Sequence, residues 1–330
     1  MRATLLLAAS LLAASAAARA AELQPAIVFD VGGKFDKSFN EGVDDGAQRF
    51  SKATGIEVRS FEPQNDSQRG QALRKFARAG NDPILAVGFA FAGDLTSVAK
   101  EFPNTRFVII DSVVDAPNVQ SIVFKEQEGS YLAGMLGAMA AGTGKLGFVG
   151  GMDIPLIRRF ACGYAQGAHA VRPDVEVLQN MTGTTGSAWN DPVRGGELAR
   201  SQIERGANVI FQAAGATGIG VLQAATDAGK LGIGVDSNQN QMHPGHMLTS
   251  MLKRVDVAAE SAFAAARDGT WKPGVSVLGL AQNGVALAFD EENAPLVTAE
   301  QKARVMAAAT DIASGKIAVH DYMVDKSCPN

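Results

Sequence analysis

The chain has 330 residues, of which 46% are hydrophobic and 19% charged, and its formal net charge is −4 at pH 7. A chain of this length forms either one large α/β unit or two lobes of ordinary domain size. The acidic balance argues against nucleic acid as a partner, because nucleic-acid-binding surfaces need clustered positive charge.

The first 20 residues are typical of a secretory signal peptide. Arg2 supplies the positive start, Leu5–Leu12 the apolar segment, and Ala18–Ala20 a small-x-small cleavage site. The apolar run is too short to span a bilayer. No cysteine follows it, so we expect an exported, soluble protein that is not a lipoprotein. Removal of the peptide's two arginines would change the net charge from −4 to −6.

A strand, a glycine turn and a helix start open the mature chain. Residues 26–29 predict the strand, and Ser38 with Glu41 has the capping-box spacing of a helix start. A helix N-terminus leaves free backbone N–H groups. Phe39 and Asn40 stand there, and we interpret the stretch as half of a binding cleft for a flat, hydroxyl-rich small molecule. The alternative is a solvated turn whose phenylalanine packs locally.

Strands and helices then alternate in two runs. In the first run we expect strands at 57–61, 83–89 and 107–110 and helices at 67–79 and around Leu95–Phe102. In the second we expect helices at 128–141, 155–171 and after Asp191, strands at 145–149, 175–178, 208–211 and 232–236, and a loop at 182–188. Two such runs fit two doubly wound lobes, each with a parallel sheet, better than one oversized sheet.

The C-terminal part does not extend the second run. It predicts a strand at 247–252, a helix at 254–268, strands at 275–280 and 285–289 around a hairpin-type turn at 282–284, and a last helix at about 298–314. Such elements are expected if the chain crosses back to the first lobe and then returns, which would leave several strands between the lobes as a hinge.

Acidic residues stand at the carboxyl ends of three predicted strands, at Asp30, Asp111 and Asp236. Ligands bind just outside those ends in open α/β sheets, and a carboxylate accepts hydrogen bonds from neighbouring hydroxyls. A turn or capping role is the alternative for each one. Three at matching points favour a polyol or ribose site.

Trp189 lies in a polar, glycine-rich loop, where an aromatic ring forms either a small local core or a stacking surface. Phe39 and Trp189 would then close on opposite faces of one planar ring, and the alternative is burial in separate lobes.

The turn at Gly215 resembles a dinucleotide fingerprint, but its glycine order differs from G-x-G-x-x-G, so we interpret it as a turn that reaches a neutral ligand. No catalytic constellation is visible, and no histidine has a second ligand at the spacing of a metal site on a helix, so we expect no enzyme activity, cofactor or metal.

In an exported chain the pair Cys162 and Cys328 suggests a disulfide, with two unpaired thiols as the alternative.

Eight segments give the chain a resemblance to the basic membrane protein family of ABC-transporter substrate-binding proteins, which includes the purine nucleoside receptor. They occur in the expected order over nearly the whole mature chain, at residues 36–40, 108–111, 147–151, 160–168, 189–192, 214–220, 233–239 and 248–253. The resemblance implies a two-lobed periplasmic-binding-protein fold of type I with a hinge of three crossings. The N-terminal lobe would take residues 21–122 plus about 248–278, and the C-terminal lobe about 123–247 plus 279–330.

The resemblance also implies a set of ligand-binding residues. Phe39 and Trp189 would stack on the base, although Trp189 departs from the phenylalanine associated with this position. Asn40 would contact the base, and Asp111 the base or sugar edge. Asp236 would bind ribose hydroxyls with Lys253 nearby as a donor. The full set is Asp36, Phe39, Asn40, Phe89, Asp111, Trp189, Gly215, Asp236 and Lys253.

The implied function is capture of a purine nucleoside or related base in the periplasm, by a monomer that docks on an inner-membrane ABC permease. Three alternatives stay open. The ligand is another small polar molecule, such as a free purine base, a sugar or a signalling molecule. The protein is a ligand-sensing adaptor for a membrane receptor. Or it is a secreted dinucleotide-dependent enzyme that uses the turn at Gly215.

Overall fold

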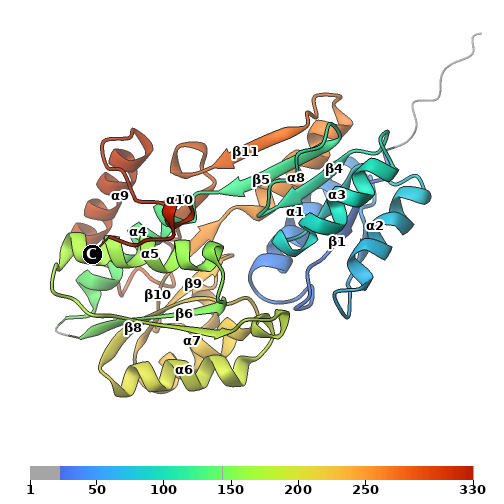
Figure 1. The fold of residues 1–330 in the computed structure, drawn as a ribbon. Helices are drawn as coiled ribbons and strands as arrows, with labels where there is room; N and C mark the ends of the chain where they lie inside the picture. The colour runs from blue at the N-terminus through green and yellow to red at the C-terminus, as the bar shows by residue number, and fades with distance from the viewer. Residues whose placement is uncertain (1–22, 143, 330) are drawn as a thin grey trace, which may run out of the picture.

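The structure is a computed structural model and describes residues 23–142 and 144–329. The predicted signal peptide lies outside the described residues. Two six-stranded sheets form two lobes, which are joined by strands that run between them (Figure 1).

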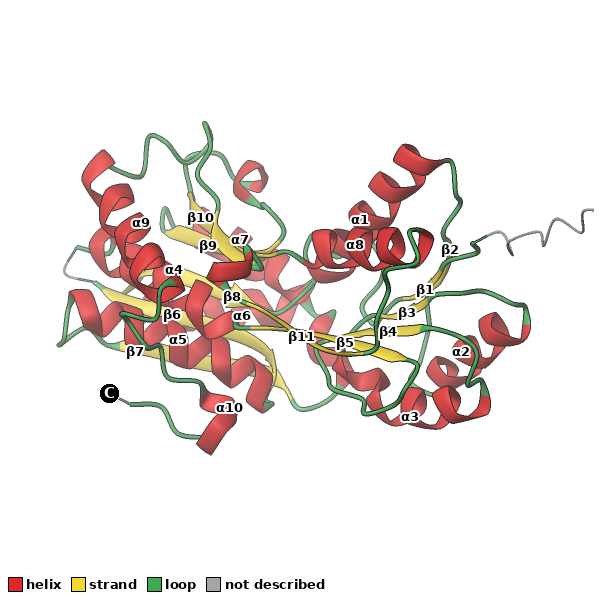
Figure 2. Cartoon of the chain, turned by 90° about the horizontal axis from the view of Figure 1, so that it is seen from above, coloured by secondary structure: helices red, strands yellow, loops and turns green. Residues whose placement is uncertain are grey.

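The first lobe is built on a parallel sheet that is covered on both faces. Its strands are β1 (Ala26–Val28), β2 (Arg59–Phe61), β3 (Ile84–Ala86), β4 (Phe107–Ile110), β5 (Val119–Phe124) and β11 (Gly274–Leu278), in the order β11-β5-β4-β3-β1-β2. Figure 2 shows α1 (Phe39–Thr54) and α8 (Val255–Arg267) on one face, and α2 (Gln68–Arg78) and α3 (Ala92–Glu101) on the other. The central strands are apolar throughout because neither of their faces meets water.

The second lobe repeats this arrangement. Its strands are β6 (Lys145–Met152), β7 (Val177–Gly183), β8 (Ala207–Ala213), β9 (Leu231–Asp236), β10 (Met247–Lys253) and β12 (Val285–Leu287), in the order β12-β10-β9-β8-β6-β7. Helices α4 (Glu126–Ala140), α5 (Pro155–Val171) and α9 (Ala299–Ala313) cover one face, and α6 (Pro192–Glu204) and α7 (Thr217–Asp227) the other (Figure 1). Only the pairing of β12 with β10 is antiparallel within this sheet. The prediction of two doubly wound parallel sheets is confirmed.

The chain passes between the lobes three times. β5 leads from the first sheet into α4, β10 leads from the second sheet into α8, and β11 leads back towards β12. Helix α8 belongs to the first lobe, because it packs on α1 and its Asp256 and Glu260 form ion pairs with Arg49 of α1. The sequence predicted that the chain returns to the first lobe at about residue 248, whereas β10 (Met247–Lys253) still belongs to the second sheet. Residues 249–252 pair with β9 and Lys253 pairs with Val285 of β12, both in the second sheet, so the crossing follows Lys253.

The predicted hairpin around residues 282–284 is wrong. β11 pairs in parallel with β5 in the first sheet, whereas β12 pairs with β10 in the second. The turn signal is real, since Asn283 has a φ of 54°, but it redirects the chain from one lobe to the other. Strand β5 was not predicted from the sequence, because it follows β4 without an intervening helix and so breaks the β–α alternation.

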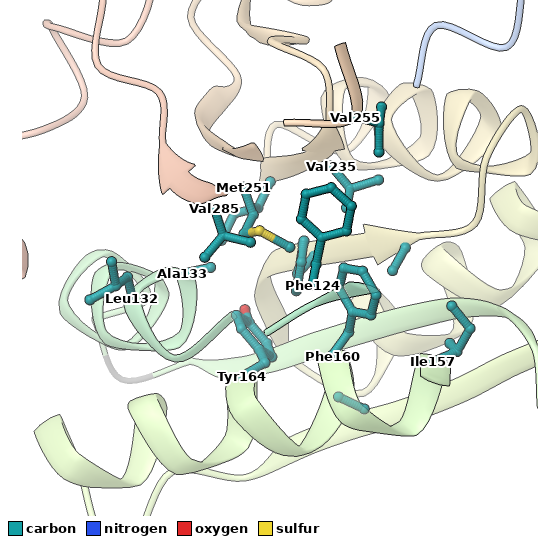
Figure 3. Close-up of a cluster of buried hydrophobic side chains, with 14 of the residues drawn as sticks. Phe124, Leu132, Ala133, Ile157, Phe160, Tyr164, Val235, Met251, Val255 and Val285 are labelled. Carbon is teal, nitrogen blue, oxygen red and sulfur yellow. The ribbon is translucent and has the colours of Figure 1, made fainter. Parts of the chain in front are cut away.

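An apolar core continues from the first lobe through the hinge into the second. Figure 3 shows Phe124 of β5 beside Phe160 of α5, next to Val235 and Met251 of the second sheet, and all four belong to one buried cluster. The chain after α9, here called the C-terminal segment (residues 314–329), is attached to α5 by a disulfide between Cys162 and Cys328. Among the helices that the structure describes, none combines the length and apolar character needed to cross a membrane.

Candidate ligand-binding cleft

A cavity lies between the two lobes, with an empty volume of about 620 Å³ including the space at its mouth. All nine residues that the sequence analysis proposed for ligand binding line it, five from the first lobe and four from the second. They are Asp36, Phe39, Asn40, Phe89 and Asp111, and Trp189, Gly215, Asp236 and Lys253. Their contact with a ligand stays a prediction.

Asp111 and Asp236 occupy equivalent places in the two lobes. Asp111 directly follows β4, and Asp236 is the last residue of β9. Both have left-handed backbone conformations, with φ of 69° and 62°. This conformation is unfavourable by about 1–2 kcal/mol for a residue with a side chain, and such strain concentrates at functional sites. The surrounding structure therefore holds two carboxylates at the strand ends where ligands of open sheets bind.

Lys253 lies between carboxylates and aromatic rings. Its Nζ donates to Asp111 Oδ2 at 2.6 Å and lies 3.0 Å from Glu126 Oε1. The same atom lies 5.2 Å from the ring centroids of Phe39 and Phe124 and 5.6 Å from that of Phe160. Burial opposes the charged form of this lysine, but the facing carboxylates outweigh it and raise its pKa. Lys253 is therefore a fixed cation, and an ammonium has three N–H donors.

The two carboxylates retain acceptor capacity. Burial raises the pKa of Asp111 and of Asp236 to about 6, and the charge of Lys253 lowers both only in part. Asp236 Oδ2 accepts a hydrogen bond from Ser38 Oγ at 2.6 Å. Asp111 Oδ1 is buried and has no hydrogen-bond partner among the described residues. Because buried polar atoms in proteins nearly always have partners, this oxygen points to a donor on a ligand or water.

Three half-buried aromatic rings also line the cavity, Phe39 and Phe89 from the first lobe and Trp189 from the second. Two of these rings meet across the lobes, since Phe89 contacts Trp189 edge to face with the ring centroids 6.5 Å apart. The indole rests on Gly151, where an added Cβ would overlap the ring. The proposed stacking of Phe39 and Trp189 on opposite faces of one ligand ring stays a prediction. The ring that Trp189 contacts directly is Phe89, the first residue of a short 3-10 helix after β3.

Asp36 and Asn40 line the cavity but are largely occupied by the protein. The Asp36 carboxylate accepts from the backbone N–H groups of Ser38, Asn40 and Glu41 at 2.9–3.1 Å, so it caps α1. The predicted capping box is therefore wrong, and the Ser38 hydroxyl serves Asp236 instead. The Asn40 amide accepts from Asp30 N–H and donates to Gly33 C=O, which holds the loop before α1.

The third strand-end acid, Asp30, is neutralised by a neighbour that the sequence analysis missed. Arg69 of α2 is buried and donates to Asp30 Oδ1 at 3.0 Å. Asp30 also lines the cavity, with Oδ1 held by Arg69 and by the Val31 N–H group. Ile157 and Phe160 of α5 also line the cavity and were interpreted only as core residues, because their helical spacing suits either role.

The lobes touch through polar contacts beside the cavity. Ser237 Oγ donates to Ser38 C=O at 2.8 Å, and Gln239 Nε2 donates to Lys37 C=O at 2.8 Å. Together with the bond from Ser38 to Asp236, these contacts join the start of α1 to the end of β9. The structure therefore represents a closed arrangement of the lobes. Within residues 23–142 and 144–329 no group of three or more metal-binding side chains occurs.

Comparison with known proteins gives four findings. A family model described as ABC transporter substrate-binding protein PnrA-like matches residues 23–321. The chain is 32% identical over 321 residues to the ABC transporter nucleoside-binding protein BmpA of Lactococcus lactis, which covers 90% of this chain and 89% of that protein. It is 36% identical over 282 residues to an uncharacterised lipoprotein of Pyrococcus abyssi, covering 81% of this chain and 69% of that protein. A solved structure of an ABC transporter solute-binding protein from Aeropyrum pernix matches with a TM-score of 0.85 at 28% identity, over 92% of this chain and 95% of that one.

The structural match confirms the predicted two-lobed periplasmic-binding-protein fold of type I. The Pyrococcus relative is named as a lipoprotein, so the expectation of a protein without a lipid anchor finds no support in that comparison.

Proposed function

This chain belongs to the PnrA-like family of ABC transporter substrate-binding proteins, and we propose that its interlobe cavity captures a purine nucleoside. The family consists of binding proteins rather than enzymes, so the chain is the ligand-binding component of a transporter that acts outside the cytoplasm. The observation that carries the nucleoside proposal is that one cavity is lined both by a carboxylate–lysine group, Asp111, Asp236 and Lys253, and by aromatic rings from both lobes.

The carboxylate–lysine group suits a pair of neighbouring hydroxyls. Asp111 and Asp236 each offer a carboxylate oxygen that can accept from a hydroxyl, and Lys253 supplies a donor between them. Hydrogen bonds to charged groups contribute about 1.5–3 kcal/mol each. Phosphate is disfavoured here, because Asp111, Asp236 and Glu126 outnumber the Lys253 cation. The proposed ligand is therefore a nucleoside rather than a nucleotide.

The aromatic rings suit a heterocyclic base. Phe39, Phe89 and Trp189 come from both lobes and surround the space beside the polar groups. Base–aromatic stacking contributes roughly 1–3 kcal/mol per base. The nucleoside-binding relative from Lactococcus supports the same ligand class.

Ligand capture follows from the division of contacts between the lobes. A ligand that touches Asp111 on one lobe and Asp236 and Trp189 on the other binds the closed form better than the open form, and so shifts the hinge equilibrium. The closed protein then docks on its inner-membrane permease. We propose the periplasm as the site of action, because the first 20 residues have the pattern of a cleaved signal peptide.

Isothermal titration calorimetry tests the ligand class. We expect inosine, guanosine or adenosine to bind with a dissociation constant of about 1 μM or tighter, equivalent to about −8 kcal/mol, and ribose alone to bind much more weakly. Asp236→Ala should abolish nucleoside binding. Binding of a free base with the same affinity as its nucleoside would reject the sugar contacts. Retention of nucleoside binding in Asp236→Ala would reject the site assignment.

A further inference from the structure

A row of five alternating charges runs from the cavity to the C-terminal segment. Asp111 Oδ2 accepts from Lys253 Nζ at 2.6 Å, and Lys253 Nζ lies 3.0 Å from Glu126 Oε1. The other oxygen of Glu126 accepts from Arg159 Nη1 at 2.8 Å. Arg159 Nε and Nη2 donate to the two carboxylate oxygens of Asp321, each at 2.8 Å.

The row becomes more exposed with distance from the cavity. The side chain of Glu126 is completely buried and that of Lys253 is 2% exposed, whereas Arg159 is 13% and Asp321 25% exposed. A buried charge is stable only while its partners stay in place. The position of each inner member therefore depends on the member outside it.

Asp321 belongs to a segment that is fixed to α5 at further points. Gln166 donates to His320 C=O at 3.0 Å and accepts from His320 N–H at 2.9 Å. The disulfide between Cys162 and Cys328 closes the segment a few residues later. The opposite side of the same helix lines the cavity with Ile157 and Phe160. One helix thus lies between the ligand site and the C-terminal segment.

We propose that Asp321, acting through Arg159 and Glu126, positions the Lys253 ammonium for the ligand. Glu126, Arg159 and Asp321 do not line the cavity, so they are positioning residues that act through Lys253. The inference rests on the proposed function, in which Lys253 donates to the sugar of a nucleoside.

The Arg159 guanidinium links Asp321 to Lys253, because it binds the carboxylates of both Asp321 and Glu126. Nη1 of Arg159 serves Glu126 and the Phe124 carbonyl, while Nε and Nη2 serve Asp321. The planar fork of arginine holds this geometry only while both sides are engaged. Without the charge of Asp321, the guanidinium turns towards Glu126 and draws that carboxylate away from Lys253. The ammonium, already bonded to Asp111 Oδ2, then turns towards Asp111 Oδ1 and occupies the oxygen that the sugar needs.

Asp321→Asn is the decisive variant. Asp321 Oδ1 also accepts from Met323 N–H at the start of α10 (Tyr322–Asp325), and asparagine can keep that cap while losing the charge. Asp325→Asn is the matched control, because Asp325 lies on the same short helix and outside the row of charges. We expect Asp321→Asn to weaken inosine binding about five- to tenfold, as for other coupled residues in contact. Binding of hypoxanthine, the same base without the sugar, should change less than twofold, and Asp325→Asn should leave both affinities unchanged.

A base-and-nucleoside comparison separates positioning from general damage. Equal losses for inosine and hypoxanthine, or an unchanged inosine affinity in Asp321→Asn, would overturn the inference while leaving the proposed function intact. Failure of the wild type to bind either ligand would overturn both. If Asp321→Asn does not fold, as judged by its melting curve, Arg159→Lys gives the same comparison, because lysine keeps the charge but cannot engage both carboxylates as a fork. The same selective loss is expected, and an equal loss would again overturn the inference.

Discussion

The affinity for a nucleoside should fall as the pH is lowered through about 6. Burial raises the pKa of Asp111 and of Asp236 to about 6 in the ligand-free cavity. Ligand hydroxyls that donate to these carboxylates stabilise their charged forms and so lower both pKa values in the complex. Above about pH 7 both groups are already ionised and binding requires no proton release. Below about pH 6 each must lose a proton before the hydroxyls can donate to it.

The size of the effect follows from the pKa values. At about pH 5, one unit below its pKa, each carboxyl is protonated in about nine molecules of ten. Proton release then weakens binding about tenfold for each group, or about 1.4 kcal/mol. The dissociation constant should therefore rise about a hundredfold between about pH 7.5 and about pH 5 if both groups contact the ligand.

Calorimetric titration with inosine at both pH values measures this change, and Asp236→Asn supplies the internal control. The variant retains one titrating carboxyl, so it should bind more weakly at neutral pH but lose only about tenfold on acidification. A dissociation constant that stays constant across the range would refute the assigned role of the carboxylates. An affinity that rises on acidification would mean that the protonated carboxyls donate to the ligand.

Three substitutions test other parts of the site. Trp189→Ala should weaken nucleoside binding about 10- to 100-fold, the equivalent of one lost stacking contact, and calorimetry showing an unchanged affinity would contradict its role. Asp36→Ala should lower the free energy of unfolding in urea by about 2–3 kcal/mol, because three backbone N–H groups of α1 lose their acceptor, whereas the exposed Asp45→Ala should change it by about 0.5 kcal/mol or less. Gly151→Ala should displace the indole and reduce affinity at a nearly unchanged melting temperature, and Gly186→Ala, which meets no neighbouring atom, should bind as the wild type does.

Alternation of apolar strands with amphipathic helices was enough to predict two doubly wound sheets. Strands such as 107–110 read as continuous apolar runs because a parallel sheet buries both faces, so their sequence records their environment directly. The acids at the strand ends were also visible, since Asp111 and Asp236 follow such runs at equivalent points. The hairpin turn at 282–284 was not predictable in the same way. A turn sequence bends the chain locally, and the choice between pairing with a neighbour and crossing to another sheet depends on strands far away in the chain.

The sequence by itself determined the residue types at the cleft, because apolar patterning fixes where strands end and which side chains stand there. Only the tertiary structure decided their partners. It assigned Arg69 to Asp30, the Asp36 carboxylate to the start of α1, Phe89 to Trp189, and Glu126 to Lys253. Hydrogen bonds, ring contacts and ion pairs act over a few ångströms in space. Residues that are 127 positions apart in the chain, such as Glu126 and Lys253, have no shared signal in the sequence until folding brings them together.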